Sequence, residues 1–264
     1  MIIGELINSS RKAIRPLIEN GDTEALLQIA QLQADAGADY LDLNCGAFVK
    51  DETEKLTWLV KNVGIPSGKA LCLDSPNPDA LKAVLPMIDG TVMINSVSGE
   101  EKRCNDILPL AIEYKTKLVA LCMDDAEIPQ NAEARYGIGA RLVERLTAAG
   151  MDISDIYLDP LVQPVSVSPD GAKVILDTVV RIKEAYPDIH CICGLSNISY
   201  GLPNRKLINR YFLSQAAAAG MDSFIMDPTD NKLMGCYLVS RVLLGQDKFC
   251  AKYLKAHRKG LFEE

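Results

Sequence analysis

The feature that most constrains the fold is a regular alternation of short apolar runs with longer amphipathic segments along the whole chain. Such runs predict strands at Ile2–Leu6, Tyr40–Asn44, Ala70–Asp74, Thr91–Asn95, Leu118–Met123, Ile156–Asp159, Cys191–Gly194 and Ser223–Met226. Helical spacing predicts helices over Thr23–Ala36, Glu52–Asn62, Pro78–Leu85, Glu100–Tyr114, Ala132–Ala149, Pro169–Ala185, Arg205–Ala219 and Leu233–Leu244. Strands that alternate with helices indicate a parallel sheet, because parallel neighbours need a crossover connection.

The regularity of these units favours a closed barrel over an open sheet. The chain has 264 residues, and a (β/α)₈ TIM barrel needs roughly 250. An open dinucleotide-binding sheet usually carries G-x-G-x-x-G after its first strand, and this chain has no such motif. We therefore predict an α/β fold with one (β/α)₈ barrel over residues 1–246. Residues 247–264 form a C-terminal tail, in which the basic segment Lys252–Lys259 is predicted to be helical.

Composition excludes several functional classes. A net charge of −7 argues against nucleic-acid binding, because phosphate backbones attract basic surfaces. No apolar run approaches the roughly 20 residues that span a bilayer, so no membrane association is expected. The N-terminus lacks the features of a secretory signal, and we expect a cytoplasmic protein.

The cysteines are scattered and favour reduced core thiols over a metal site. None of the eight forms a C-x-x-C pair, and the chain has only two histidines. The best cluster, His190–Cys193, places two cysteines on one face of a strand, which is too few ligands for zinc. We expect no protein-bound metal.

Polar side chains end most of the predicted strands. Asp74, Asn95 and Asp159 end the third, fourth and sixth strands, and Asn197 follows the seventh. The carboxyl ends of barrel strands meet at one mouth, which is where TIM barrels place their active sites. Carboxylates and amides accept hydrogen bonds from amino and ring N–H groups, so these residues suit a flat nitrogen heterocycle. Neither a glycine-rich phosphate loop nor a nucleophile elbow is present.

At these residues the sequence resembles the pterin-binding methyltransferases that act on methyltetrahydrofolate and corrinoid proteins. This family includes the corrinoid/iron–sulfur protein methyltransferases and components of anaerobic demethylation systems. The matching stretches keep their order across nearly the whole chain: Ile3-Gly-Glu-Leu-Ile-Asn8, Ala38-Asp-Tyr-Leu-Asp-Leu-Asn44, Leu71-Cys-Leu-Asp-Ser75, Met93-Ile-Asn-Ser96, Tyr157-Leu-Asp-Pro160, Gly194-Leu-Ser-Asn197 and Asn204-Arg-Lys-Leu-Ile-Asn-Arg210.

The resemblance implies methyl transfer between a methyl-corrinoid protein and N5 of tetrahydrofolate, in a TIM barrel that forms a homodimer. It implies that Asp74, Asn95 and Asp159 hold the pterin ring. Asn197 would contact N5, which makes Asn197 and Asp159 the catalytic candidates. The remaining candidates for pterin or folate contact are Gly194, Ser196, Tyr200 and Arg205, the last of them toward the folate tail.

The chain lacks the family's cobalamin-binding signature, D-x-H-x-x-G. The segment Asp188-Ile-His190-Cys-Ile-Cys-Gly194 has one residue too many before the glycine and overlaps the predicted seventh strand. The corrinoid is therefore expected on a partner protein.

Tyr200 stands where the acetyl-CoA-pathway members usually have glutamine. This departure favours a demethylation system, in which tetrahydrofolate accepts the methyl group.

Two alternatives stay open at this point. A dihydropteroate synthase has a related barrel and pterin pocket, but it needs basic residues for a pyrophosphate leaving group. This chain has Ser196-Asn197-Ile198 where that family typically has Ser-Arg-Lys, and Leu161-Val-Gln-Pro where it has a glycine-rich turn. A non-catalytic pterin-binding module would keep the ring contacts and would have no use for Asn197.

Overall fold

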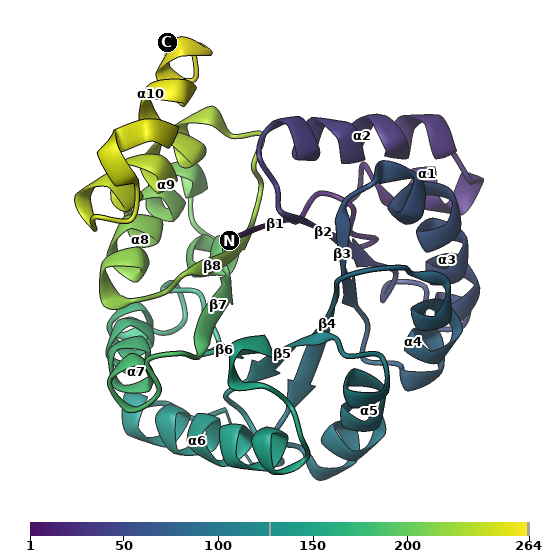
Figure 1. The fold of residues 1–264 in the computed structure, drawn as a ribbon, viewed down its shortest axis with the longest axis horizontal. Coiled ribbons are helices and arrows are strands. Elements are labelled where there is room, and N and C mark those ends of the chain that lie inside the picture. The colour runs from purple at the N-terminus through teal and green to yellow at the C-terminus, as the bar shows by residue number, and fades with distance from the viewer. Residues whose placement is uncertain (127, 263–264) are drawn as a thin grey trace.

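The computed structural model describes residues 1–126 and 128–262 and shows a closed barrel of parallel strands (Figure 1). The strands are β1 (Ile2–Gly4), β2 (Tyr40–Asn44), β3 (Ala70–Asp74), β4 (Val92–Ser98), β5 (Lys117–Leu121), β6 (Ile156–Asp159), β7 (His190–Gly194) and β8 (Ser223–Met226). They follow one another in chain order around the barrel. The barrel closes where Ile3 of β1 pairs with Ile225 of β8. The predicted TIM-barrel fold is confirmed.

Helices surround the barrel on its outside (Figure 1). They are α1 (Arg15–Asn20), α2 (Thr23–Asp35), α3 (Glu52–Leu59), α4 (Pro78–Val84), α5 (Glu101–Glu113), α6 (Ala132–Ala148), α7 (Gly171–Ala185), α8 (Arg205–Ala219), α9 (Asn231–Leu243) and α10 (Ala251–Arg258). Helix α10, drawn in yellow, projects from the edge of the ring beside α9. The short helix α1 was not predicted from the sequence, because its six residues are too few to show a helical period.

Side-chain caps explain where several helices begin. Asp22, Asn77, Asn131 and Asp230 each accept a hydrogen bond from a backbone N–H in the first turn of α2, α4, α6 and α9, respectively. These bonds satisfy amide groups that have no partner within the helix. The caps lie in the loops that leave the carboxyl ends of the strands, so they also hold the mouth in shape.

Three strands end at other residues than predicted, and one of them, β5, stops at Leu121 instead of Met123. Strand β1 stops at Gly4, because the Leu6 N–H donates to the side-chain oxygen of Gln33 at 3.0 Å instead of to a neighbouring strand. Strand β4 continues past Asn95 to Ser98 and shifts register against β5 between Asn95 and Val97. Asn95 consequently points from within a strand, below the rim of the mouth.

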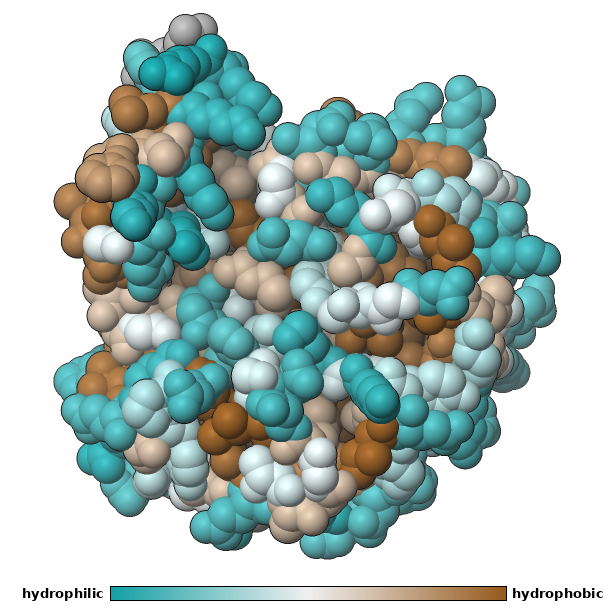
Figure 2. All heavy atoms as spheres, in the orientation of Figure 1, coloured by the Kyte–Doolittle hydropathy of each residue, from teal (hydrophilic) through white to brown (hydrophobic). Residues whose placement is uncertain are grey.

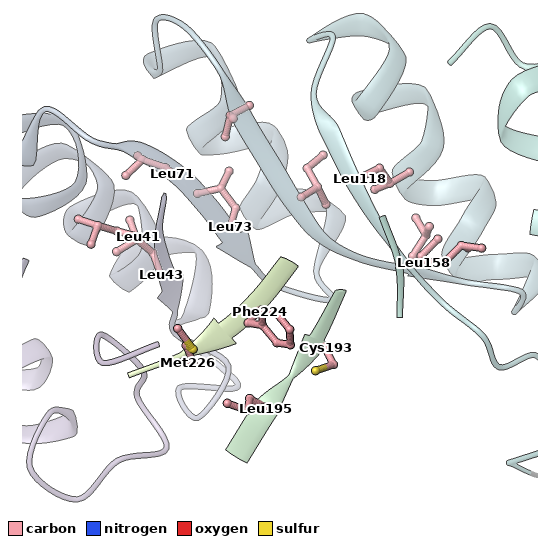
Figure 3. Packing of buried hydrophobic residues seen from close by; sticks show 14 of the residues in the cluster. Leu41, Leu43, Leu71, Leu73, Leu118, Leu158, Cys193, Leu195, Phe224 and Met226 are labelled. Carbon is pink, nitrogen blue, oxygen red and sulfur yellow. The ribbon is translucent and has the colours of Figure 1, made fainter. Parts of the chain in front are cut away.

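The alternation of side chains divides the buried residues into two layers. One set faces outward and packs against the helices, as Leu41, Leu43, Leu71 and Leu73 do in Figure 3. The other set fills the inside of the barrel and consists of Ile3, Tyr40, Cys72, Met93, Val119, Tyr157 and Ile192. The polar residues that share this inward face lie above these apolar side chains, at the carboxyl ends of the strands. The inner layer thus forms the floor of the mouth.

All eight cysteines lie in the described part of the chain and are free thiols, six of them fully buried. Cys191 and Cys193 share one face of β7, as the strand alternation predicted, and this face belongs to the outward-facing core. Hydrophilic residues dominate the face of the molecule seen in Figure 2, with hydrophobic residues scattered between them. Among the described residues, no helix has the length and apolar character that crossing a membrane requires.

Candidate functional site

A polar cavity of about 450 Å³ opens at the carboxyl ends of the strands. Its lining comes from all eight strands or their following loops and from α5: Glu5, Asn8, Ser10, Arg11, Asp42, Asp74, Asn95, Ser96, Arg103, Leu121, Asp159, Gly194, Ser196, Asn197 and Ile225. Its volume is within the range of small-molecule sites, roughly 300–1,000 Å³. The structure therefore brings Asp74, Asn95, Asp159, Gly194, Ser196 and Asn197, all candidates from the sequence, into one cavity.

Three other cavities are larger: one of about 470 Å³ adjoins the mouth cavity, and two measure about 860 and 760 Å³. The latter two lie on the outside of the molecule, against Trp58 of α3 and between α9 and the C-terminal segment. Neither contains a residue from a strand end. The mouth cavity is the better candidate, because the strands of a parallel barrel deliver their functional side chains there.

Three adjacent strands carry a row of polar side chains, of which Asp74 and Asn95 line one wall of this cavity. Asn44 of β2 is paired in register with Asp74 of β3, and Asp74 with Asn95 of β4. The Asn44 Nδ2 donates to Asp74 Oδ2 at 2.8 Å. Burial raises the pKa of Asp74, and the bond from Asn44 opposes that rise. This row exposes carboxylate and amide groups to a ligand from one side.

Asp159 faces the row from β6. Its Oδ1 accepts a hydrogen bond from the Leu161 N–H at 2.8 Å, which closes a turn directly after the strand. Only 8% of the residue is exposed, and this burial raises the pKa of Asp159 to about 7. A ligand N–H that bonded to this carboxylate would replace the lost hydration and favour the ionised form.

Asp42 belongs to the cavity but was not among the residues selected from the sequence. Its side chain is buried next to Asp74, and burial raises the pKa of Asp42 well above its usual value. Its Oδ1 has no hydrogen-bond partner within the described residues. The signal was present in the sequence: Asp42 and Asn44 are two residues apart in β2 and so share the inward face. An unpartnered buried carboxylate oxygen in a cavity fits a ligand with N–H donors.

The turn after β7 carries Gly194, Ser196 and Asn197. A Cβ on Gly194 would come within 2.9 Å of the Asn197 Nδ2, so glycine leaves room for that carboxamide. The Ser196 hydroxyl donates to Glu5 Oε2 at 3.1 Å and ties this turn to the loop after β1. Arg11 pairs with the same carboxylate at 2.6 Å. Glu5 and Arg11 were not predicted, because nothing in their spacing indicates that they meet the β7 turn.

Arg205 and Tyr200 lie outside the mouth cavity. Arg205 lines a second cavity of about 470 Å³, which shares Glu5, Arg11 and Ser196 with the first. Its guanidinium donates to the Ser196 carbonyl at 2.7 Å and lies 5.7 Å from the centre of the Tyr200 ring. Tyr200 itself is 67% exposed at the rim. The structure thus places these two candidates beside the cavity that holds the others.

The hydrogen-bond acceptors of the cavity fit a pterin. A reduced pterin presents amino and ring N–H groups in one plane, which match the oxygens of Asp42, Asp74, Asn95 and Asp159. Within the described residues, no group of three or more His, Cys, Asp and Glu side chains has an arrangement that could hold a metal ion. The arrangement can therefore bind and orient a nitrogen heterocycle and can exchange protons through buried carboxyl groups.

Comparison with known proteins gives a consistent result. Over 98% of its length the chain is 38% identical to a methylcorrinoid:tetrahydrofolate methyltransferase of Eubacterium limosum, of which it covers 97%. It is 30% identical over 240 residues to a methionine synthase of Mycobacterium tuberculosis, of which it spans only 20%.

Solved structures show the same fold. A dihydropteroate synthase of Xanthomonas albilineans aligns with a TM-score of 0.69 and 17% identity, over 92% of both chains. A model of the pterin binding enzyme family matches residues 5–227, which include strands β2 to β8 and every candidate site residue. The chain is an enzyme and belongs to this family of pterin binding enzymes.

Proposed function

We propose that this enzyme transfers a methyl group between a methyl-corrinoid protein and N5 of tetrahydrofolate. The observation that carries the proposal is the single cavity lined by Asp74, Asn95, Asp159 and Asn197 together with Asp42, whose Oδ1 has no hydrogen-bond partner among the described residues. The name and near full-length similarity of the Eubacterium limosum relative support the same reaction. Tetrahydrofolate or 5-methyltetrahydrofolate is the small substrate.

In this proposal the carboxylates hold the pterin, and Asn197 acts at the reacting nitrogen. Asp74, Asn95 and Asp159 accept from the amino and ring N–H groups, and Gly194 and Ser196 shape the turn that presents Asn197. Arg205, in the adjoining cavity, is assigned to the folate tail, and Tyr200 to the rim of the site.

Transfer to tetrahydrofolate forms a bond from N5 to methyl while the carbon–cobalt bond breaks and its electron pair stays on cobalt. N5 then loses its proton. In the reverse direction N5 must gain hydrogen-bonded or protonic character, because a tertiary amine is a poor leaving group. A neutral carboxamide both donates and accepts, so Asn197 can follow the proton in either direction. The corrinoid supplies the methyl group, and the protein binds, orients and manages the proton.

We assign the corrinoid to a partner protein that docks over the mouth, and we assign no metal to this chain. Tyr200 and the printed name of the Eubacterium limosum relative favour tetrahydrofolate as the methyl acceptor. The dihydropteroate synthase alternative is less well supported, since the turn after β7 offers Ser196 and Asn197 where a pyrophosphate leaving group needs cations.

We also propose the organisation and location of the enzyme. Residues 1–246 form the pterin-binding barrel, and residues 247–264 form a tail that packs on α9, where Phe262 lies against Gly235. A homodimer is supported by exposed apolar residues on α8, α9 and the tail: Leu207, Tyr211, Leu243 and Phe249. Buried reduced thiols suit the cytoplasm.

The test combines binding with a cobalt assay. Calorimetry is expected to detect binding of tetrahydrofolate, with strong loss of affinity in Asp74→Asn and unchanged affinity in Asp79→Asn, a surface carboxylate. Mixing enzyme, free methylcobalamin and tetrahydrofolate is expected to change the cobalt absorption spectrum and to form methyltetrahydrofolate, with or without a chelator. A wild-type protein that binds neither tetrahydrofolate nor 5-methyltetrahydrofolate would refute the proposal. Zinc-dependent activity would refute the assignment of no metal.

A further inference from the structure

Arg135 is the largest side chain that is fully buried in the described residues, with 1% of the residue exposed. It lies in the first turn of α6, outside the mouth cavity. Its Nε donates to the Pro129 carbonyl at 2.9 Å, and its Nη1 donates to the Pro160 and Leu161 carbonyls at 2.6 and 2.7 Å. Its Nη2 donates to Gln163 Oε1 at 3.0 Å. One guanidinium thus joins the loop after β5 to the loop after β6.

The position of Arg135 is unfavourable for the helix that carries it. A positive charge in the first turn opposes the helix dipole, and burial of a guanidinium costs several kcal/mol unless its donors are satisfied. The four hydrogen bonds all lead to loop carbonyls and a loop side chain, and none leads to the helix itself. We therefore attribute the position of Arg135 to its hydrogen bonds with the two loops and not to any stabilisation of α6.

The loop that Arg135 holds contains the turn that orients Asp159. Leu161 adopts a left-handed backbone conformation with φ of 63°, which a residue with a side chain rarely adopts without external support. Its N–H donates to Asp159 Oδ1, and its carbonyl accepts from Arg135. The Arg135 guanidinium and the Asp159 carboxylate are therefore both hydrogen-bonded to the backbone of Leu161. Removal of the guanidinium would release the Leu161 backbone and, with it, the Asp159 carboxylate.

Arg135 also acts on Asp159 through its charge. Burial raises the pKa of Asp159, and the positive charge of Arg135 opposes that rise. Since the pterin is to be bound through N–H groups, the ionised carboxylate is the binding form. The same side chain thus fixes the direction of this carboxylate and favours its charged state.

We propose that Arg135 is a positioning residue of the pterin site: it locks the Pro160–Leu161 turn so that the Asp159 carboxylate points into the mouth cavity. The inference rests on the proposed function in one respect, that a pterin is the ligand. It does not depend on the corrinoid step, because it is measured by folate binding.

The experiment compares Arg135→Lys, Arg135→Met and Arg141→Met by calorimetry with tetrahydrofolate from pH 6 to 8.5. Arg141 is a matched control, since it lies on the same helix and is exposed in an ion pair with Asp124. Wild-type affinity is expected to rise as the pH passes about 7, where Asp159 ionises. Arg135→Met is expected to weaken binding at least tenfold and to move this midpoint to higher pH. Arg135→Lys keeps the charge but not the planar fork, so it should weaken binding with a nearly unchanged midpoint.

Each outcome decides the proposal. Arg135→Lys with wild-type affinity would show that the fork holds nothing the pterin needs. Weaker binding in Arg135→Met with an unmoved midpoint would mean a general loss of structure and would overturn the link to Asp159. If Arg135→Met does not fold, as circular dichroism would show, the lysine variant alone decides. Wild-type protein that binds folate without any cobalt chemistry would refute the proposed reaction and leave this test intact.

Discussion

The two ends of the barrel both hold charged groups, but these groups are paired differently at the two ends. At the amino ends of the strands, Lys117 pairs with Asp155 at 2.9 Å, and Asp222 accepts from Lys183 at 2.8 Å. His190 bonds to the same Asp222 carboxylate at 3.1 Å and stacks on Tyr157. At the carboxyl ends, carboxylates gather with fewer partners, and one oxygen of Asp42 has none among the described residues.

The contrast is clearest for Asp222 and Asp159. Burial tends to raise the pKa of Asp222, yet the bonds from His190 and Lys183 hold it below its usual value. Burial raises the pKa of Asp159 to about 7, because only a backbone N–H and the more distant Arg135 charge oppose it. At the amino ends of the strands, which we call the lower end, the charged groups are paired without a ligand. At the carboxyl ends, the upper end, the carboxylates obtain matching hydrogen-bond donors only from a ligand.

The largest expected effect concerns the chemistry at the upper end. Asn197→Ala is expected to slow methyl transfer by about 100- to 1,000-fold, because it removes a group that acts on N5 in the transition state. Tetrahydrofolate affinity should change far less, since the ring contacts remain. Single-turnover kinetics and calorimetry measure the two quantities, with Asn105→Ala on the exposed face of α5 as control. Equal losses in rate and affinity would make Asn197 a binding residue only.

A second prediction is that replacing Asp by Asn changes the free energy of unfolding in opposite directions at the two ends. The raised pKa of Asp159 means that the folded protein without ligand loses stability as the pH rises from about 4 through 7. Asp159→Asn is therefore expected to raise the free energy of unfolding at pH 8 by about 1–4 kcal/mol, with no gain near pH 4.

The lowered pKa of Asp222 has the opposite consequence. This carboxylate contributes stability above its ordinary pKa, and that contribution is lost as the pH falls through its folded value. Asp222→Asn is expected to lower the free energy of unfolding at pH 8 by about 1–2 kcal/mol. Urea unfolding of both variants measures the comparison. Destabilisation by both substitutions at pH 8 would contradict the distinction between the two ends.

The smallest expected effect tests the space around Asn197. Gly194→Ala places a methyl group against the Asn197 Nδ2, which is the end of a side chain and can rotate away. The rate of methyl transfer should fall by about tenfold, because the carboxamide leaves its place. Gly137→Ala in α6 is the control, since a Cβ there meets only the tip of Arg141 at 3.9 Å. An unchanged rate would show that the position of Asn197 tolerates this shift.

The sequence was sufficient to predict the barrel, because the barrel depends on local periods, and the same periods located several residues of the candidate site. Asp74 and Asp159 were predicted as strand ends, and the structure brings them to one mouth. Asp42 was missed although its alternation with Asn44 marks the inward face. Arg135 was not predictable, because its role depends on contacts between a helix and the loop after β6, which lies 25 or more residues along the chain. Contacts of that kind leave no periodic signal.

The buried cysteines have a consequence for how the protein can be observed. Burial raises the pKa of the thiols inside the barrel wall, among them Cys72, Cys122 and Cys193, so these remain protonated and unreactive while the fold is closed. Cys236 and Cys250, on α9 and before α10, are only partly covered. A thiol reagent would therefore modify those two first. Modification of the buried thiols would follow at the rate at which the barrel opens, so the extent of their modification would measure how often the protein unfolds.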